Sequence, residues 1–369
     1  MPDSAADFVP ETPAPNDAHM WQRLLSQLTA GHNLTRAEAA WFVQSVFTGE
    51  APADLMGAVL TGLRTKHESV DELAGMLDFL LEQTTAVECS GDRLDVVGTG
   101  GDGHHSVNIS TMAAIVCAAA GVQVVKHGNR AVTSSAGSAD VLQALGVVID
   151  LPAAGVQECV QRAGIGFCFA PVYHFAMRHA AVVRKSLPHP TIFNLLGPMA
   201  NPSHPTAMLV GCADESRAAL MTQVLAGRST YALVVRGDDG LDEVSTSAPT
   251  RVWAPSGASY TFDTADFGIE RIQDGALAGG DAEFNAQVVW AVLNPDAGES
   301  VRVVRDCVVA NAAAALVAAE RAGDDESSFA SAFRTNLIRA REAISSGAAQ
   351  ATLQRWIEAS AECQTPALP

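Results

Sequence analysis

The segment Leu94-Asp95-Val96-Val97-Gly98-Thr99-Gly100-Gly101-Asp102-Gly103 runs from a short apolar stretch into a loop with four glycines in six positions. Its apolar part predicts a buried strand at residues 94–97, and the pattern beyond the loop predicts a helix at about 110–120. Further strands are predicted at residues 122–125, 166–170, 208–211 and 232–235, with helical segments between them. This alternation predicts an α/β fold with a mainly parallel sheet, in which ligands bind beyond the carboxyl ends of the strands.

A helical layer is predicted ahead of this alternation, at residues 19–86. Its first apolar stripe has helical spacing and consists of Trp21, Leu24, Leu25 and Leu28. Thr35 with Glu38, and Ser69 with Glu72, have the spacing of capping boxes at helix starts. Stripes of this kind line a core or a dimer surface.

Composition excludes several classes of protein. The chain has 369 residues, of which 48% are hydrophobic and 17% charged, so most of it folds, and the length favours two or more domains. The net charge of −18 disfavours nucleic acid and anionic membranes as partners. The seven cysteines form no CxxC pair, which favours reduced thiols over a zinc site or a disulfide framework.

No targeting or membrane-spanning segment is expected. The acidic, proline-rich start of the chain lacks the basic and apolar parts of a signal peptide, and residues 1–18 are predicted to be a disordered tail. The longest apolar run, residues 112–125, is too short to cross a bilayer and contains Gln123. These features predict a cytoplasmic protein without a membrane partner.

The glycine loop at residues 98–103 matches the GxGxxG pattern of dinucleotide sites. Such a site requires an acidic residue at the end of the next strand, but that strand ends in Lys126-His127, with no acid between residues 103 and 139. A phosphate cradle is therefore favoured, because glycines let backbone N–H groups approach a phosphate at a helix N-terminus. The alternative is a tight turn that serves packing only.

A second loop begins at Lys126 and continues through residues 127–140 with a further cation, Arg130, several hydroxyls and two glycines. This composition indicates a polyphosphate cradle with a point charge, and the alternative is a solvated loop.

A third loop, residues 237–243, contains four acidic residues, and we expect it to be an exposed turn. The acids are either solvated or ligands of Mg²⁺. Arg184, near the end of a predicted helix, is either a carboxylate-binding residue or a surface residue.

Six segments together resemble the anthranilate phosphoribosyltransferase family and follow its order. They are DVVGTGGDG at 95–103, VNIST at 107–111, KHGNRAV at 126–132, GSADVLQALG at 137–146, TIFNLLGP at 191–198 and GDDGLDEVS at 237–245. The resemblance implies transfer of the phosphoribosyl group of phosphoribosyl pyrophosphate (PRPP) to the amine of anthranilate, in tryptophan biosynthesis. It also implies a homodimer through the helical domains.

The resemblance further implies a small helical domain at residues 19–90, joined by a segment at about 185–205. A larger α/β domain with a mainly parallel central sheet is expected at residues 91–184 and 206–360, with the active site at the hinge.

Site residues follow from the same resemblance. The residues matched to PRPP binding are Gly98, Gly101, Asp102, Ser106, Asn108, Ile109, Ser110, Thr111, Lys126, His127, Gly128, Asn129, Arg130, Ala131, Val132, Thr133, Ser134 and Ser138. Gly98, Asn129 and Arg184 match the anthranilate positions, and Ser110, Asp242 and Glu243 match the positions that hold Mg²⁺, with two ions per active site. No dedicated catalytic base is expected: Lys126 and Mg²⁺ would stabilise the transition state, and His127 would order its loop.

The chain departs from the family pattern at several positions, including Gln143, Phe175, Arg178, Pro188 and Pro190. None of these positions is a matched ligand, although the two prolines could stiffen the loop beside Arg184. Two other functions are considered for a chain with this resemblance. One is that of a pyrimidine nucleoside phosphorylase, and the other is that of a non-catalytic nucleic-acid-binding relative. The intact KHGNR and GLDE motifs oppose the first, and the net charge of −18 opposes the second.

Overall fold

The computed structural model describes residues 13–131, 135–273 and 275–364. The chain forms two compact units. A helical unit contains the chain up to Glu82 together with Ala176–Ile192, and an α/β unit contains Gln83–Phe175 and the chain from Phe193 onward. The predicted combination of a small helical domain with a larger α/β domain is confirmed.

The helices of the first unit are α1 (Ala18–Thr29), α2 (Arg36–Phe47), α3 (Ala53–Lys66), α4 (Val70–Glu82) and α9 (Arg178–Ser186). Side chains cap the N-termini of α1, α2 and α4. Thr35 and Glu38 form the predicted capping box of α2. Ser69 and Glu72 exchange the corresponding bonds before α4, since Glu72 N donates to Ser69 Oγ and Ser69 N donates to Glu72 Oε2. Both boxes satisfy backbone N–H groups that a helix start leaves without partners.

The predicted disordered tail extends too far into the chain. The Asp17 carboxylate caps α1 by accepting bonds from the backbone N–H groups of His19 and Met20. The Trp41 indole also donates to the Pro13 carbonyl at 3.0 Å. Residues 13–18 are therefore held by the helical unit, whereas residues 1–12 lie outside the described part of the chain.

The α/β unit contains one sheet of seven strands in the order β3-β2-β1-β4-β5-β6-β7. The strands are β1 (Leu94–Gly98), β2 (Val124–Gly128), β3 (Ile165–Phe169), β4 (Ala207–Gly211), β5 (Tyr231–Gly237), β6 (Thr250–Trp253) and β7 (Ser259–Phe262). The first five are parallel, and β6 and β7 extend the sheet as antiparallel strands. Every predicted strand is present within a few residues of its expected position.

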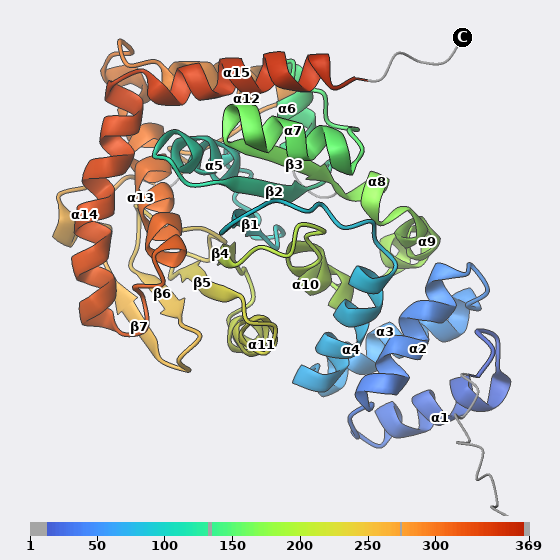
Figure 1. The fold of residues 1–369 in the computed structure, drawn as a ribbon. Helices are drawn as coiled ribbons and strands as arrows, with labels where there is room; N and C mark the ends of the chain where they lie inside the picture. The colour runs from blue at the N-terminus through green and yellow to red at the C-terminus, as the bar shows by residue number, and fades with distance from the viewer. Residues whose placement is uncertain (1–12, 132–134, 274, 365–369) are drawn as a thin grey trace, which may run out of the picture. The chain divides into compact units, whose positions relative to one another are not determined.

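Helices cover both faces of this sheet (Figure 1). They are α5 (Ile109–Ala119), α6 (Ser138–Ala144), α7 (Ala153–Ala163), α8 (Ala170–Tyr173), α10 (Ile192–Met199), α11 (Glu215–Ala226), α12 (Ala282–Leu293), α13 (Arg302–Ala319), α14 (Glu326–Ser345) and α15 (Ala348–Glu362). Three short 3₁₀ turns lie at Phe175–Met177, Thr264–Phe267 and Glu299–Val301. Helices α5, α7 and α13 lie on one face and α11 on the other, as crossovers running in opposite directions require (Figure 1).

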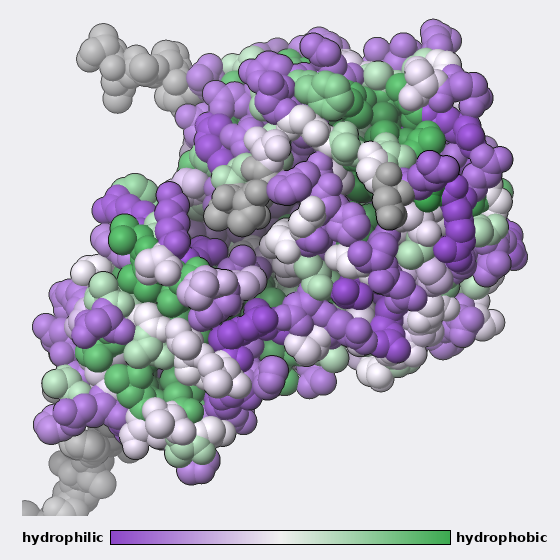
Figure 2. Space-filling model, turned by 180° about the vertical axis from the view of Figure 1, so that it is seen from behind, coloured by the Kyte–Doolittle hydropathy of each residue, from purple (hydrophilic) through white to green (hydrophobic). Residues whose placement is uncertain are grey.

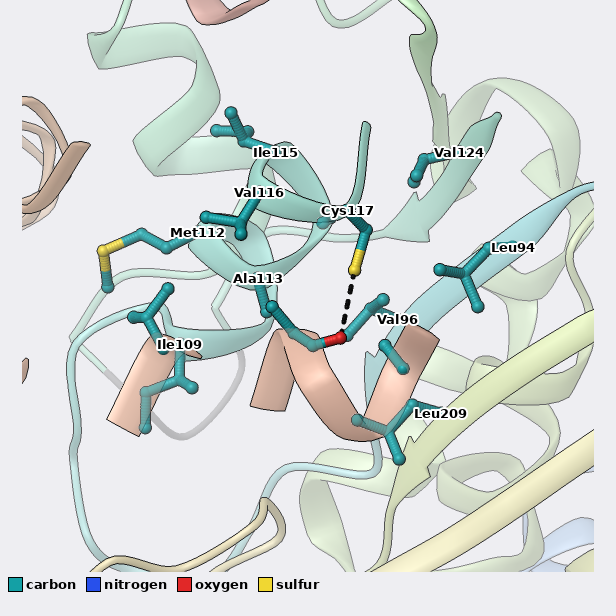
Figure 3. Packing of buried hydrophobic residues seen from close by; sticks show 14 of the residues in the cluster. Leu94, Val96, Ile109, Met112, Ala113, Ile115, Val116, Cys117, Val124 and Leu209 are labelled. Atoms are coloured by element: carbon teal, nitrogen blue, oxygen red, sulfur yellow. Dashed lines mark hydrogen bonds between the residues drawn. The ribbon is translucent and has the colours of Figure 1, made fainter. Parts of the chain in front are cut away.

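The core of this unit forms where α5 and α13 pack against each other and against one face of the sheet (Figure 3). Met112, Ile115 and Val116 of α5 are fully buried, and so are Leu94 and Val124 of the strands beneath. The Cys117 thiol, also buried, donates to the Ala312 carbonyl of α13 at 3.5 Å (Figure 3). This packing fixes the start of α5, where a functional loop ends.

The segment that joins the helical unit lies earlier than the predicted residues 185–205. It spans Ala176–Ile192, and its helix α9 packs on α2 and α3. The chain from Phe193 belongs to the α/β unit, because the Asn201 side chain donates to Asp95 Oδ2 at 2.8 Å and to the Val125 carbonyl at 2.7 Å. These two buried bonds anchor residues beyond α10 to the sheet.

Within the described ranges, none of the helices combines the length and apolar character that crossing a membrane would require.

Candidate functional site

The loops singled out in the sequence follow β1, β2 and β5 at one edge of the sheet. The chain leaves β1 toward β2 on one side, while β4 and β5 lie on the other side. Strand order therefore reverses between β1 and β4, and open α/β sheets bind ligands outside the carboxyl ends of strands at such a switch point. The glycine loop after β1 and the acidic loop after β5 meet there, since Gly100 N donates to Asp242 Oδ2 at 2.6 Å.

Two glycines allow this close approach. A Cβ on Gly98 would lie 2.5 Å from Asp242 Oδ2, and a Cβ on Gly211, at the end of β4, would overlap the Asp242 carbonyl oxygen. Gly211 was not among the predicted site residues. Its position at the end of a predicted strand is a signal for close backbone contact, but the sequence does not show which segment approaches.

The last two acids of the acidic loop are buried, contrary to the expectation of an exposed turn. Asp242 and Glu243 are each only 9% exposed. Asp239 instead organises the turn by accepting bonds from Leu241 N, Ser245 Oγ and Ser247 Oγ, whereas Asp238 is exposed. Asp242 and Glu243 are thus the two acids that this loop directs to the glycine loop and to the start of α5.

Burial and nearby negative charge raise the pKa values of both carboxyl groups. Burial raises the pKa of Glu243 to about 8, helped by Asp102 and opposed by Lys126 and by the Ser110 backbone N–H, which bonds to the carboxylate. Burial, followed by the charges of Glu243 and Asp102, holds the pKa of Asp242 well above its ordinary value. A cation bound between these acids would relieve the repulsion.

This donor set fits Mg²⁺. Among the described residues, no group of three or more His, Cys, Asp or Glu side chains is arranged to hold a metal. Mg²⁺ is usually bound through one or two carboxylates and takes its other ligands from water and substrate phosphates. Asp242 and Glu243, with the Ser110 hydroxyl beside them, match that requirement better than a site built wholly from protein groups.

Lys126, within β2, is buried beneath the loops. It is 1% exposed, and its ammonium donates to the Val96 carbonyl and, at 3.2 Å, to Ser110 Oγ. Burial lowers the pKa of Lys126, and the charges of Asp95 and Glu243 oppose that effect. Lys126 therefore acts on the start of α5 through the Ser110 hydroxyl.

The remainder of the glycine loop leads into α5. Gly100, Gly101 and Gly103 have positive φ angles of 63°, 77° and 79°, which favour glycine. Asp102 is half-buried, and it accepts bonds from His104 N at 3.0 Å and from Asp242 N at 3.4 Å. Of the other predicted site residues, Ser106 and Asn108 precede the helix, and its first turn contains Ile109, Ser110 and Thr111. Asn108 is the residue before α5, and its side chain makes no capping bond to that helix.

The second loop is held by Asp140. Its carboxylate accepts bonds from Arg130 Nη1 at 2.8 Å and from the backbone N–H groups of Ala131 and Gly137, both at 2.9 Å. The Ser138 hydroxyl donates to the Asn129 carbonyl at 3.4 Å, and a side chain on Gly128 would collide with that hydroxyl. Val132, Thr133 and Ser134 lie outside the described residues. Asn129 and Arg130 are exposed at the mouth of this loop.

A network of buried polar side chains joins residues of the strands β1 and β2, from which the two loops begin. His127 Nδ1 donates to the Gly197 carbonyl at 3.0 Å, and the His174 ring lies edge-on to it, with ring centres 5.3 Å apart. Burial, then the His174 charge, lowers the pKa of His127 to about 3, so the ring is neutral. His127 N also donates to Asp95 Oδ1 at 3.3 Å.

Asp95 is a member of this buried network that the sequence reasoning missed. It is fully buried in β1, and burial raises its pKa to about 6 against the opposing charge of Lys126. An aspartate inside the apolar run at residues 94–97 was the available signal. Arg184 belongs to α9 of the helical unit, and burial lowers the pKa of its half-buried guanidinium.

A glycine loop ahead of a helix, a second loop with the exposed cation Arg130, and a buried acidic pair are the features expected of a phosphate-binding transferase on a doubly wound sheet. Residues 90–350 match the model of the glycosyl transferase family a/b domain, and residues 22–84 match that of its helical bundle domain. An anthranilate phosphoribosyltransferase from Saccharopolyspora erythraea is 49% identical over 348 residues, which cover 94% of this chain and 97% of that protein.

Solved structures agree with this class. The crystal structure of anthranilate phosphoribosyltransferase from Thermus thermophilus superposes on this chain with a TM-score of 0.84 and a sequence identity of 34%. The match covers 92% of this chain and 99% of that chain. The enzyme from Saccharomyces cerevisiae in complex with PRPP and Mg has the same fold, with a TM-score of 0.85 at 24% identity, covering 95% and 100% of the two chains. This chain belongs to the anthranilate phosphoribosyltransferase family.

Proposed function

We propose that this enzyme transfers the phosphoribosyl group of PRPP to the amine of anthranilate, giving N-(5-phosphoribosyl)-anthranilate and pyrophosphate in tryptophan biosynthesis. The observation that carries the proposal is the buried pair Asp242 and Glu243, which faces a glycine loop and the start of α5 in a chain of this family. That arrangement suits a substrate with a pyrophosphate group and a divalent cation.

The chemistry requires little proton transfer by the protein. The aromatic amine of anthranilate is neutral at pH 7, and its lone pair forms the new bond to C1 of the ribose. The bond between C1 and the pyrophosphate oxygen breaks with its electron pair, and the amine then releases a proton to solvent. His127 is a poor general base for this step, because its ring is buried and its pKa is lowered to about 3.

The protein's task is therefore to hold PRPP and to stabilise the charge that develops on pyrophosphate. The N–H groups of the glycine loop and the N-terminus of α5 would bind phosphate oxygens, together with the second loop around Asn129 and Arg130. Lys126 keeps the Ser110 hydroxyl oriented and adds positive charge beneath it. All the proposed PRPP residues that the structure describes belong to the α/β unit.

Mg²⁺ would be held by Asp242, Glu243 and Ser110, with two ions per active site, and would supply positive charge to the pyrophosphate oxygens. Anthranilate would be recognised by Gly98, Asn129 and Arg184. A planar guanidinium matches a carboxylate with two parallel hydrogen bonds, which makes Arg184 the candidate for that group.

An assay of anthranilate fluorescence tests the reaction directly. Purified protein should consume anthranilate only when PRPP and Mg²⁺ are both present, with one pyrophosphate released per anthranilate lost. Phosphorolysis of pyrimidine nucleosides, without consumption of anthranilate, would overturn the proposal in favour of a nucleoside phosphorylase.

The metal assignment is tested by the double substitution Asp242→Asn with Glu243→Gln, which keeps the size of both side chains. Because neutral side chains of the same size remain buried there, we expect an intact fold with activity reduced at least 100-fold and little rescue by excess Mg²⁺. Asp238→Asn, an exposed acid of the same loop, should retain parental activity. Parental turnover in the double variant would contradict the assignment.

We also propose a homodimer through residues 19–86, in the cytoplasm. On the visible face of the helical unit, green hydrophobic residues lie among purple hydrophilic ones (Figure 2), and Val70 remains 36% exposed. Sedimentation equilibrium at micromolar concentration should give about 77 kDa, twice the chain mass of 38.4 kDa. A monomer at every concentration would exclude the dimer.

A further inference from the structure

Hydrogen bonds made by two side-chain amides link three separate segments of the α/β unit. Asn285, on the first turn of α12, accepts a bond from Gly280 N at 2.9 Å through Oδ1 and donates to Asn108 Oδ1 at 2.9 Å through Nδ2. Asn108 Nδ2 in turn donates to the Ala136 carbonyl at 3.1 Å. Asn285 is 2% exposed, so water does not replace these partners.

The first of these segments is a strap at residues 275–280, which lies along residues 105–107, the stretch that continues the glycine loop to α5. Ser106 pairs with Ala278 in an antiparallel bridge, flanked by bonds from Val107 N to the Leu277 carbonyl at 2.9 Å and from Gly279 N to the His105 carbonyl at 2.8 Å. A Cβ on Gly279 would lie 2.9 Å from the Ser106 carbonyl oxygen, so only glycine permits this approach. The strap thus holds the part of the glycine loop that leads into α5.

The other two segments are the two phosphate loops. Asn108 closes the glycine loop immediately before α5, and Ala136 lies at the far end of the second loop, next to Gly137 and its bond to Asp140. The single side chain of Asn285 therefore fixes the strap and the first loop together, and Asn108 passes that constraint on to the second loop.

We propose that Asn285 is a positioning residue that holds the two phosphate-binding loops in register for PRPP. It touches neither loop's N–H groups nor the acidic pair, and its effect on the reaction passes through Asn108. The donor and acceptor of each of these hydrogen bonds are fixed. Asn285 Oδ1 accepts from a backbone N–H, so Nδ2 is the only group of that side chain that can face Asn108 Oδ1. The inference rests on the proposed function, since it names the substrate that the loops bind.

The test is the kinetics of Asn285→Asp and Asn285→Ser, compared with Gln287→Glu, an exposed amide on the same helix. In Asn285→Asp a carboxylate oxygen faces Asn108 Oδ1, so two acceptors oppose each other. Loss of one buried hydrogen bond with an unpartnered group left behind corresponds to about 10- to 100-fold in binding. We expect KM for PRPP to rise by that factor, KM for anthranilate to change less than threefold, and Gln287→Glu to match the parent.

A double-substitution cycle gives the second readout. If Asn285 acts through Asn108, the combined Asn108→Ser and Asn285→Ser variant should lose little more PRPP affinity than Asn108→Ser alone. Additive losses would overturn the proposal, and so would an Asn285→Ser variant that folds with parental KM for PRPP.

Failure of the underlying reaction would look different. Parental protein that neither turns over nor binds PRPP in the presence of Mg²⁺ would refute the proposed function. Amide exchange at Val107, Gly279 and Gly280 would then decide the positioning role by itself, since faster exchange in Asn285→Ser is expected and unchanged exchange would overturn it.

Discussion

At the scale of single residues, the site depends on ionisable side chains that are buried behind its loops. Asp95, Lys126 and His127 lie on two adjacent strands, and each has a pKa moved by burial toward its neutral form. Hydrogen bonds between these groups and backbone carbonyls or amides compensate for the lost water. The stability of the fold is therefore linked to pH.

Acid should destabilise the protein through His127. Above about pH 6.5 the histidine is neutral in both states; below it, the unfolded chain binds a proton that the folded protein does not take up until about pH 3. The unfolded state then holds more protons, so stability falls as pH falls. Between pH 7 and 5 the parent should lose about 2 kcal/mol more unfolding free energy than His127→Gln, whose side chain has no such charge.

Urea unfolding followed by circular dichroism at pH 7, 6 and 5 measures this difference. His32→Gln, a substitution on the exposed surface of the helical unit, serves as the matched control and should follow the parent. Parallel pH profiles for the parent and His127→Gln would show that His127 does not contribute.

At the scale of elements, the second loop owes its shape to the first turn of α6. Although burial raises it, the pKa of Asp140 is held below its ordinary value by bonds from Ala131, Gly137 and Arg130. Its carboxylate thus ties both sides of the loop to the helix N-terminus, where negative charge is also favoured. The Arg130 guanidinium lies 5.6 Å from the Phe169 ring centre and donates to Gln143 at 2.7 Å, which orients the exposed cation.

Removal of this carboxylate should loosen the loop without unfolding the unit. In Asp140→Ala we expect faster amide exchange at Ala131 and Gly137, and a KM for PRPP raised about tenfold or more, because charged hydrogen bonds are worth about 1.5–3 kcal/mol. Hydrogen-exchange mass spectrometry and steady-state kinetics measure the two effects. Asp150→Ala, an exposed aspartate after the same helix, should leave both unchanged; unchanged exchange at Ala131 and Gly137 in Asp140→Ala would contradict the role of this residue.

At the scale of the whole molecule, the proposed substrate residues come from both units. The described residues assigned to PRPP belong to the α/β unit, whereas Arg184 belongs to the helical unit, on the segment Ala176–Ile192. The two substrates can therefore be perturbed separately. Substitution in α9 should affect anthranilate and leave the phosphate loops as they are.

Arg184→Ala should raise KM for anthranilate by roughly 10- to 150-fold, the equivalent of a charged hydrogen bond of about 1.5–3 kcal/mol, and leave KM for PRPP nearly unchanged. Lys185→Ala, the next residue of α9 and exposed, is the control. Steady-state kinetics with each substrate varied in turn gives the result. Equal weakening of both substrates would mean that Arg184 is structural and that another group binds the carboxylate.

The sequence by itself determined the elements and the order of the loops. Periodic apolar residues, the boxes at Thr35 and Ser69, and glycines after the strand at residues 94–97 predicted helices, strands and connecting loops close to where they lie. These signals are local, since capping bonds span three residues and turn geometry depends on a few φ angles. The family motifs extended this to a reaction because they retain order and spacing.

Only the tertiary structure decided which of these groups are buried and which ones meet. The bond from Gly100 to Asp242 joins residues 142 positions apart, and that from Asn285 to Asn108 joins residues 177 apart. Neither contact leaves a periodic trace in the sequence, so the burial of the acidic pair, the covered position of Lys126 and the role of Asn285 were not foreseen. Burial and hydrogen bonding of a polar group depend on segments brought together by the sheet, and that information exists only in the folded chain.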